Sequence, residues 1–330
     1  MWPDLSDLLA SAHVVSLPLV TRFRGITQRE ALLLPGPEGW TEFSPFVEYE
    51  DDEAATWLRA TIDFGWTPVP HQWRDRIAVN ATVPAVGAEA VPGVLERFPG
   101  ARSAKVKVAE QGQSLADDVR RVRAVREILG PEGRIRVDAN GLWNIDEAEH
   151  AIHALAEFDL EYVEQPCASI DDLVEIRTRT AYMGVPIAAD ESVRKASDPL
   201  EVARAGAADI LIIKAQPLGG IHAALKIIAE AGLPVVVSSA IDTSVGIAMG
   251  AHLAAAIPDL EFDCGLGTVA LLTQDVTDEP LAPINGGIEV RRPLVSERLL
   301  ETFAAPDDRR QWWLARLARC YRVLSVTDAS

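Results

Sequence analysis

Charged side chains follow consecutive short apolar runs in the middle of this chain. Two lysines, Lys105 and Lys107, lie in one run, and the next three runs each end at an acidic residue: Asp138, Glu164 and Asp190. Three carboxylates brought together offer the oxygen ligands that Mg²⁺ prefers, and Mn²⁺ accepts the same ligands. The pattern therefore predicts a divalent-metal site held by the three acids, with lysines beside it.

A further lysine, Lys214, ends the apolar run at residues 210–213. Burying an ammonium group is costly unless anionic partners lie nearby, and the predicted metal ligands are such partners. In a closed barrel this lysine lies across from Lys107, so two lysines approach a substrate from opposite faces. A lysine whose pKa is lowered by nearby positive charge can remove the proton next to a carboxylate, and a cation stabilises the dianion that forms. We therefore predict an enzyme for a small carboxylate, with Lys107 and Lys214 as catalytic residues.

Each of these residues also has a purely structural explanation. Lysines are common on edge strands, and acids after strands often cap the helix that follows. Three acids at equal intervals, each at the carboxyl end of a strand, are harder to explain in this way, because catalytic groups gather at that end of βα barrels. Three polar neighbours would orient the ligands: Asn140, Gln165 and Glu191.

The apolar runs recur every ~25–30 residues, which fits one strand, one helix and two loops. Several runs are apolar on both faces, as expected for a parallel sheet covered by helices. Eight strands with helices between them favour a closed barrel, with an open doubly wound sheet as the alternative. We predict strands centred near Val79, Val106, Val137, Val163, Ala188, Ile212, Val236 and Phe262.

Stop and cap signals support the helices between these strands. Gly130 ends the first helical pattern, Asn144 and Glu147 form a capping-box pattern for the next, and Gly232 ends a later one. The first 75 residues lack the βα rhythm and predict a few strands and a helix near residues 52–62. The Asn-Gly-Gly sequence at residues 285–287 predicts a hairpin. We expect a last helix at residues 310–324, packed by its aromatic face onto the N-terminal part.

Length and charge narrow the class of protein. A chain of 330 residues suits one large domain and one smaller one. A net charge of −18 argues against nucleic acid and against an anionic membrane surface, but not against a small anionic substrate in a locally positive pocket. Three cysteines without CxxC spacing predict reduced thiols. With no signal peptide and no membrane span expected, we predict a cytoplasmic protein, and the oligomeric state stays open.

The charged motifs together resemble the muconate-lactonising subgroup of the enolase superfamily. They are KVK at 105–107, DAN at 138–140, EQP at 164–166, DES at 190–192, and Lys214. The resemblance covers nearly the whole chain. It implies an α/β fold in which residues 76–284 form a (β/α)7β TIM-like barrel. Residues 1–75, completed by 285–330, would form an α+β capping domain.

Softer signals are similar to the o-succinylbenzoate synthase family within that superfamily. They are FRGI at 23–26, WTEFSPF at 40–46, the serine pair at 238–239, and GLG at 265–267. The resemblance implies a carbon–oxygen lyase of menaquinone biosynthesis. Its reaction is the Mg²⁺-dependent syn dehydration of 2-succinyl-6-hydroxy-2,4-cyclohexadiene-1-carboxylate to o-succinylbenzoate.

The resemblance also implies roles for individual residues. Lys107 would remove the α-proton and then help hydroxide leave, Lys214 would stabilise the enediolate, and Lys105 would support the base. The substrate's succinyl arm would contact Ser238, Ser239 and the Gly265 backbone. Residues 22–25 would close over the site.

Three alternatives accompany this interpretation. An N-succinylamino acid racemase, or another muconate-lactonising-type enzyme, would use the same catalytic groups, so the motifs do not separate it from a synthase. The GxGxxA pattern at residues 265–270 is typical of nucleotide-binding proteins, but it follows seven predicted strands instead of the first one. A non-catalytic scaffold is the third alternative, because a barrel alone does not dictate function.

Overall fold

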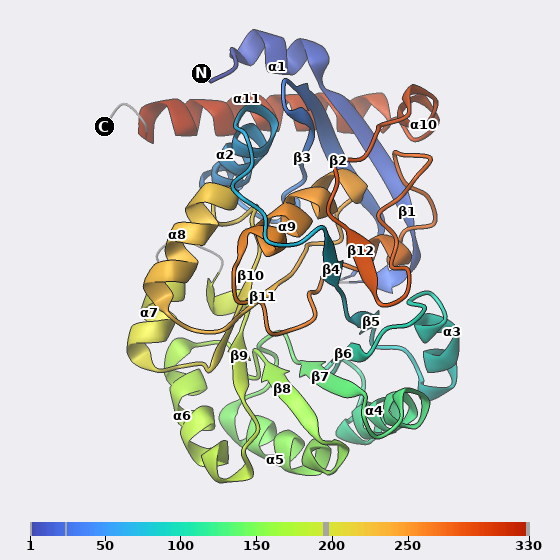
Figure 1. Ribbon diagram of the computed structural model, residues 1–330, viewed down its shortest axis with the longest axis vertical. Helices are drawn as coiled ribbons and strands as arrows, with labels where there is room; N and C mark the ends of the chain where they lie inside the picture. The colour runs from blue at the N-terminus through green and yellow to red at the C-terminus, as the bar shows by residue number, and fades with distance from the viewer. Residues whose placement is uncertain (1, 24, 194–197, 328–330) are drawn as a thin grey trace.

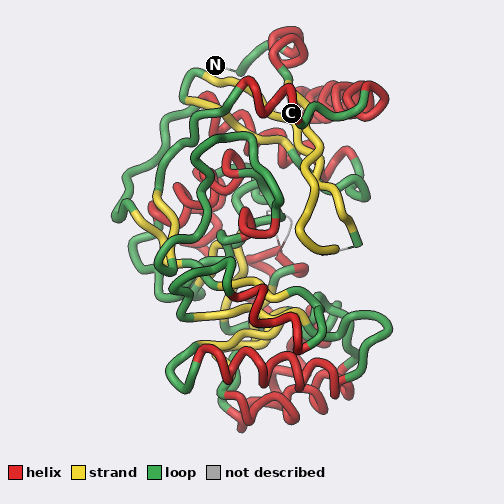
Figure 2. The backbone as a smooth tube through the Cα atoms, turned by 90° about the vertical axis from the view of Figure 1, so that its right-hand side faces the viewer, coloured by secondary structure: helices red, strands yellow, loops and turns green. Residues whose placement is uncertain are grey.

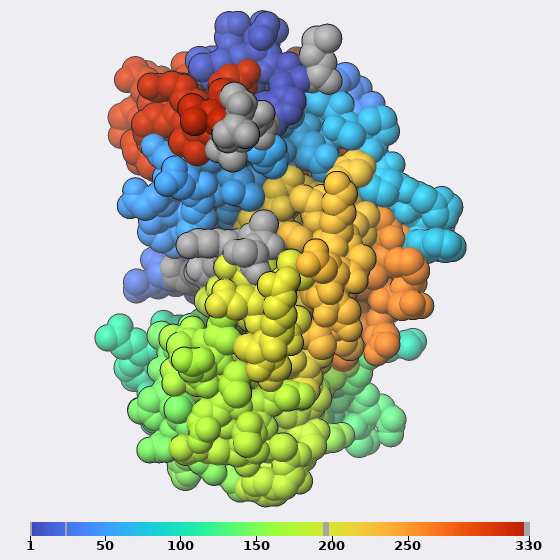
Figure 3. Space-filling model, turned by 90° about the vertical axis from the view of Figure 1, so that its left-hand side faces the viewer, coloured from blue at the N-terminus to red at the C-terminus, as the bar shows by residue number. Residues whose placement is uncertain are grey.

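The computed structural model describes residues 2–23, 25–193 and 198–327, and it divides into two layers. Figure 1 shows a small antiparallel sheet with its helices in the upper layer and a barrel of strands and helices below. Both ends of the chain lie in the upper layer. In the space-filling view, blue N-terminal and red C-terminal residues gather at the top and green and yellow residues at the bottom (Figure 3). The layer built by the start of the chain is therefore completed by its end.

The upper layer contains a three-stranded antiparallel sheet in the order β1-β2-β3. Its elements are α1 (Leu5–Ser11), β1 (His13–Phe23), β2 (Ile26–Gly36), β3 (Gly39–Phe43) and α2 (Asp51–Trp66). The helix predicted near residues 52–62 is confirmed and is longer than expected. Helix α1 was not predicted, because its seven residues bury one side chain, Leu8, and carry little periodicity. Figure 2 shows the β1–β2 hairpin extending from this layer toward the barrel.

The lower layer is a parallel sheet of seven strands in the order β11-β10-β9-β8-β7-β6-β5. These strands are β5 (Ala81–Val83), β6 (Ser103–Lys107), β7 (Arg134–Asp138), β8 (Leu160–Glu164), β9 (Ile187–Ala189), β10 (Ile210–Ile213) and β11 (Val235–Val237). The order follows the sequence, as in a barrel and unlike an open sheet with a switch point. The strand predicted near Val79 is divided: this residue lies between β4 (Arg76–Ala78) and β5.

The prediction of an eighth strand near Phe262 is wrong. Parallel single bridges join Val79 to Cys264 and Ser238 to Gly265 instead. Because these bridges connect the two edges of the seven-stranded sheet, residues 264–265 close the barrel without forming a regular strand. Glycines at positions 265 and 267 explain the short pairing, since glycine weakens a strand interior.

Helices alternate with the strands around the barrel. They are α3 (Val91–Leu95), α4 (Leu115–Leu129), α5 (Ile145–Leu155), α6 (Ile170–Thr180), α7 (Asp198–Ala205), α8 (Ile221–Ala231) and α9 (Ser244–Ala256). The predicted end signals are confirmed, with Gly130 and Gly232 at positive φ and reciprocal bonds between Asn144 and Glu147. Helix α9 is buried on every side. A helix that is apolar all round must be enclosed by protein, and here β3 of the upper layer covers α9.

The C-terminal segment returns to the upper layer. Its elements are β12 (Gly287–Glu289), which pairs with β4, then α10 (Glu297–Thr302) and α11 (Asp307–Thr327). The predicted hairpin is confirmed, with positive φ at both Asn285 and Gly286, as a type I′ turn requires. The predicted last helix is confirmed too. Its Trp313 is fully buried, with its ring 5.9 Å from that of Phe43. The residue limits predicted for the two domains stay a prediction.

No helix in the described part of the chain is both long and apolar enough to cross a membrane.

Candidate active site

The predicted charged residues come together at the carboxyl ends of neighbouring strands. In the ladder, Lys107 on β6 pairs with Asp138 on β7, and Asp138 pairs with Glu164 on β8. Asp190 directly follows β9, and Lys214 directly follows β10. Parallel strands present their carboxyl ends on one edge of a barrel, so the regular sequence spacing becomes a spatial cluster.

Lysines and carboxylates alternate within this cluster. Lys105 Nζ lies 2.6 Å from Glu164 Oε1 and 2.9 Å from Asp138 Oδ2. Lys107 Nζ lies 2.6 Å from the same Asp138 oxygen. Lys214 forms an ion pair with Asp190 Oδ1. Three lysine side chains thus face three acidic side chains at ion-pair distance.

Burial and mutual charge shift the pKa values of these groups. Burial and the Asp138 carboxylate raise the pKa of Glu164 well above its usual range. Burial alone would also raise the pKa of Asp138, but Lys105 and Lys107 lower it below its usual value. In the same way, burial works against the ionised form of Lys105, yet Asp138 and Glu164 raise its pKa. The protein therefore concentrates negative charge on Asp138 and holds it there with the β6 lysines.

Amide side chains orient the charged groups. Asn140 Oδ1 accepts a hydrogen bond from Lys107 Nζ at 2.7 Å, while Asn140 Nδ2 donates to Glu191 Oε1 at 3.1 Å. Gln165 Oε1 accepts from the backbone N–H of Asp190 at 2.9 Å. The structure thus places the three predicted orienting residues beside the acids. Asn140 and Gln165 adopt positive φ, a conformation that aims each side chain back at the strand ends.

A serine pair and a glycine lie at the other end of the cluster. Ser239 Oγ donates to the Gly265 carbonyl at 2.7 Å and is 2.9 Å from Thr268 Oγ1. Gly265 bridges to Ser238, and a Cβ atom at Gly265 would lie 2.6 Å from Ser238 Oγ. A side chain at position 265 would therefore require the Ser238 hydroxyl to move. Ser238, Ser239 and Gly265 all line one pocket with Lys105, Lys107 and Lys214.

Comparisons with known proteins agree with this architecture. Residues 14–65 match the family model described as enolase N-terminal domain-like, and residues 85–293 match the model described as enolase C-terminal domain-like. The o-succinylbenzoate synthase of Mycolicibacterium smegmatis is 54% identical over 98% of this chain and 98% of its own length. The chain belongs to the o-succinylbenzoate synthase family of the enolase superfamily.

Two further proteins are similar to this chain over most of its length. The o-succinylbenzoate synthase of Mycobacterium tuberculosis is 54% identical over 98% of this chain and 97% of that protein. The solved structure of 2-chloromuconate cycloisomerase from Rhodococcus opacus has the same fold, with a TM-score of 0.76 and 23% identity over 90% of this chain and 98% of that one. The predicted α/β barrel with a capping domain is confirmed by these matches.

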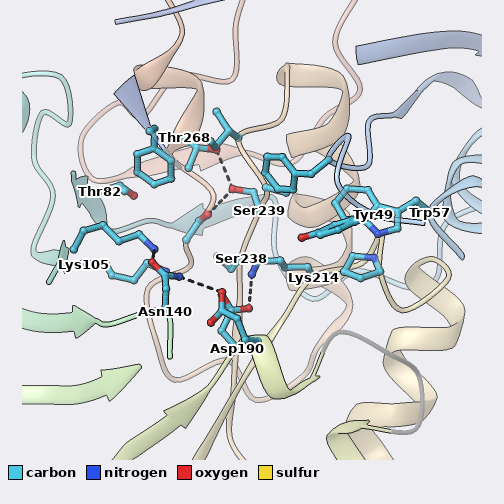
Figure 4. Close-up of a pocket in the computed structure, with 18 of the residues that line it drawn as sticks. Tyr49, Trp57, Thr82, Lys105, Asn140, Asp190, Lys214, Ser238, Ser239 and Thr268 are labelled. Carbon is cyan, nitrogen blue, oxygen red and sulfur yellow. Dashed lines mark hydrogen bonds and ion pairs between the residues drawn. The ribbon is translucent and has the colours of Figure 1, made fainter. Parts of the chain in front are cut away.

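The capping domain of this chain supplies pocket walls that were not predicted from the sequence. Four of its residues line the pocket. Phe46 and Tyr49 lie in the connection between β3 and α2, and Glu53 and Trp57 lie on α2. In Figure 4, Tyr49 and Trp57 lie on one side with Lys214, while Lys105 and Asn140 lie on the other. Phe46 stood within a family-like motif, but the other three carry no pattern that sets them apart from ordinary helix and turn residues.

The predicted closing segment lies beside Lys107. Arg22, Phe23 and Gly25 line a hollow next to the pocket, together with Lys107 and Asn140. Arg24, in the middle of the segment, lies outside the described residues. Phe23 lines both spaces, and its ring centroid is 5.6 Å from Lys107 Nζ. Phe23 thus lies next to the Lys107 side chain, which is 12% exposed.

The acids of this enolase-superfamily site have the donor chemistry for a divalent ion. Oε2 of Glu164 is buried, and it has no hydrogen-bond partner among the residues that the structure describes. An unsatisfied carboxyl oxygen beside two further acids suits a hard cation with oxygen ligands, whose charge would favour the ionised form. Within residues 2–23, 25–193 and 198–327, no three such side chains are grouped to hold an ion as they stand, since each acid turns to a lysine. The three acids therefore suit such an ion by their donor chemistry and by their shared place at the carboxyl ends of β7, β8 and β9.

Proposed function

We propose that this chain catalyses the Mg²⁺-dependent syn dehydration of 2-succinyl-6-hydroxy-2,4-cyclohexadiene-1-carboxylate to o-succinylbenzoate, a step of menaquinone biosynthesis. The observation that carries this proposal is the set of three acids and two lysines on consecutive strand ends, in a chain 54% identical to named o-succinylbenzoate synthases. The proposal assigns a carbon–oxygen lyase reaction, with a small carboxylate as the substrate.

Lys107 is the proposed base and then the proposed acid. In its neutral form, Nζ takes the proton from ring carbon C1, next to the substrate carboxylate, and leaves an enediolate. The same Nζ then returns that proton to the hydroxide leaving C6 on the same face, so water departs and the ring becomes aromatic. One residue serves both steps because syn elimination places both groups on one face. Its bonds to Asp138 and Asn140 fix the position of Nζ before the reaction.

Lys214 and Lys105 are proposed to act by charge. Lys214 extends from β10 on the opposite side of the pocket and keeps its proton, so its ammonium group stabilises the enediolate from the second face. Lys105 shares Asp138 with Lys107 and holds Glu164, and it adds positive charge beneath the substrate carboxylate. Neither residue gains or loses a proton in this proposal.

Asp138, Glu164 and Asp190 are the residues that would hold the metal ion. A bound divalent cation supplies positive charge at the substrate carboxylate, which lowers the cost of forming the dianion. Mg²⁺ is the proposed ion, and Mn²⁺ would accept the same ligands. Gln165 supports this arrangement by binding the Asp190 backbone and the backbone of Ser192.

The succinyl arm is proposed to extend toward the serine pair. Ser238, Ser239 and Gly265 line the pocket, and the two serines offer hydroxyl groups there. In Figure 4 the serines lie between Lys105 on one side and Tyr49 and Trp57 on the other. Residues 22–25 of the hairpin would close beside Lys107 and exclude water, which strengthens electrostatic effects in the site.

A substrate comparison tests the proposal. Purified protein with Mg²⁺ is mixed with the cyclohexadiene carboxylate, and the aromatic product is followed by absorbance. In parallel, the protein is mixed with a single enantiomer of an N-succinylamino acid, and optical rotation is followed. We expect rapid aromatisation and slow or absent racemisation. Racemisation that is much faster than aromatisation would overturn the proposal in favour of an N-succinylamino acid racemase.

A further inference from the structure

A carboxylate of the capping domain caps a helix of the barrel. Glu42, on β3, accepts hydrogen bonds at Oε2 from the backbone N–H groups of Thr243 and Gly246, both at 3.1 Å. The Thr243 hydroxyl also donates to this oxygen. These groups form the first turn of α9, whose amides have no partner within the helix. The negative charge also suits the positive end of the helix dipole.

An arginine of the capping domain holds the loop that leads into the same helix. Arg29, on β2, donates through Nε to the carbonyl of Ile241 at 3.0 Å and lies 3.7 Å from Asp242 Oδ1. Ile241 has a φ of 61°, in the left-handed region that a β-branched residue rarely adopts. A conformation of this kind persists only when its surroundings hold it in place. Arg29 is the residue that binds its carbonyl.

The three charged residues are buried between the domains. Arg29 is 3% exposed, Glu42 is fully buried, and Asp242 is 2% exposed. Burial of this kind gives little net stability compared with an apolar contact, but removing one partner leaves an uncompensated charge. Such a cluster therefore fixes one relative position of the two domains better than an apolar surface, which tolerates sliding.

The same residues touch both walls of the substrate pocket. The Arg29 guanidinium lies 4.6 Å from the ring centroid of Phe46, which lines the pocket from the capping domain. Ile241 lines it from the barrel, two residues after Ser239. A shift of Arg29 would thus move both walls, and it would disturb the loop that starts at the serine pair.

We propose that Arg29, Glu42 and Asp242 form an interdomain clamp that sets the width of the substrate pocket by fixing Phe46 against the loop at residues 238–243. They are positioning residues that act through the pocket walls. The inference rests on the proposed function for its substrate, although the clamp itself is a property of the fold. It predicts that the clamp governs substrate affinity more than the chemical step.

A glycine in α9 provides a variant that removes no hydrogen-bonding group. A Cβ atom at Gly246 would lie 2.9 Å from the Glu42 carboxyl carbon and 2.6 Å from the Asp242 Cβ. Alanine normally strengthens a helix relative to glycine. Here Gly246→Ala must push the clamp apart. Gly93 in α3, where an added Cβ atom would meet nothing within 4 Å, is the matched control.

Asp275 provides a second control at the same helix end. Its carboxylate accepts from the Ser244 backbone N–H and from the Ser244 hydroxyl, so it caps α9 as Glu42 does. Asp275 belongs to the segment after the barrel-closing bridge and not to the N-terminal sheet. Asp275→Ala therefore weakens the helix cap without removing the connection through Glu42.

The test compares steady-state kinetics and amide hydrogen exchange in the full-length variants. We expect Glu42→Ala and Gly246→Ala to raise KM about tenfold while kcat falls less than about threefold, because uniform binding is lost. Exchange in residues 238–243 should become faster in both. Glu42→Gln, whose amide oxygen still accepts from the helix, should restore KM to within about twofold of the wild type. Gly93→Ala and Asp275→Ala should leave KM unchanged.

Two outcomes would overturn the clamp. One is a folded Gly246→Ala protein with wild-type KM and wild-type exchange at residues 238–243. The other is an Asp275→Ala protein whose KM rises as much as that of Glu42→Ala, which would make the effect one of helix stability. A wild-type protein without turnover would reject the proposed function instead, and the exchange data would still decide the clamp.

Discussion

Asp138 Oδ2 lies 2.6 Å from Lys107 Nζ and 2.9 Å from Lys105 Nζ, so one carboxylate oxygen holds both lysines of β6. A cation bound by Asp138 would compete for that oxygen. Lys105 keeps a second partner in Glu164, and Lys107 keeps one in Asn140. The loss of Asp138 as a partner would therefore leave Lys107 held by an uncharged group, directed by Asn140 toward the substrate.

Asn140 is thus expected to be important for the rate of the reaction. Asn140→Ala removes the remaining neutral partner of Lys107, and a displaced catalytic group lowers kcat by about 10–100-fold. Asn144→Ala is the matched control, because it removes an exposed helix cap, costs about 1 kcal/mol of stability and leaves kcat unchanged. Steady-state kinetics of both variants decide the matter. Equal kcat values for Asn140→Ala and the wild type would show that Lys107 needs no such support.

Metal binding should stabilise the folded protein through the three acids. With Mg²⁺ at about 100 times its dissociation constant, the free energy of unfolding should rise by about 2.7 kcal/mol. Asp190→Asn replaces an anionic ligand by a neutral amide, so Mg²⁺ should bind more weakly and most of that gain should be lost at the same concentration. Asp209→Asn, at the start of β10 on the other edge of the barrel, should retain it. Thermal unfolding with and without Mg²⁺ measures the effect, and an equal gain in both variants would contradict the assigned ligands.

Glu42 should make the stability of the fold depend on pH. Burial and the Asp242 carboxylate raise its pKa from 4.5 to about 7, while Arg29, Ser44 and Thr243 oppose the shift. The folded state therefore holds this proton more tightly than the unfolded state. The contribution of Glu42 to the free energy of unfolding is fully present below about pH 4.5. It is lost as the pH rises through about 7, by up to about 3 kcal/mol.

The Glu42→Gln variant isolates that dependence. The introduced amide cannot ionise, so the variant lacks the loss that the wild type shows with rising pH. The free energy of unfolding of Glu42→Gln minus that of the wild type should therefore increase between pH 5 and pH 8. His252 contributes the opposite trend, because burial lowers its pKa to about 4 and its stability is lost as pH falls. Since His252 is present in both proteins, it cancels in the difference. Denaturant unfolding at several pH values gives the difference, and a constant value across this range would refute the expected shift.

Trp313 should hold the C-terminal helix on the capping domain. It is fully buried, and its indole N–H donates to Glu30 at 2.9 Å. Trp313→Ala should lower the free energy of unfolding by about 3–5 kcal/mol, because a large cavity forms. The neighbouring Trp312 is half-buried, so Trp312→Ala should lower the free energy of unfolding much less. Calorimetric unfolding of the two variants makes the comparison, and equal losses would contradict this packing.

The sequence allowed the barrel and its charged strand ends to be predicted, because both depend on local patterns. Asp138, Glu164 and Asp190 each end an apolar run, and parallel pairing brings such ends to one edge. The eighth strand was predicted wrongly because Phe262 continued the apolar rhythm. That side chain instead packs with Tyr162, and the chain pairs only at residues 264–265.

Contacts between the domains could not be predicted in this way. Glu42 and Gly246 are separated by 204 positions, and no local pattern relates a strand residue to a distant helix turn. Tyr49 and Trp57 line the pocket only because α2 docks above the barrel. Such residues follow from tertiary packing, and propensity and periodicity carry no information about it.

The most direct test of the central claim is turnover of the cyclohexadiene carboxylate by the purified protein with Mg²⁺. The same assay is run on Lys107→Ala and on wild-type protein treated with EDTA. We predict rapid formation of o-succinylbenzoate by the wild type, a loss of about 10²–10⁴-fold in kcat for Lys107→Ala, and recovery of the EDTA-treated protein when Mg²⁺ is restored. Undiminished turnover by a folded Lys107→Ala protein, or by the metal-free wild type, would contradict the account.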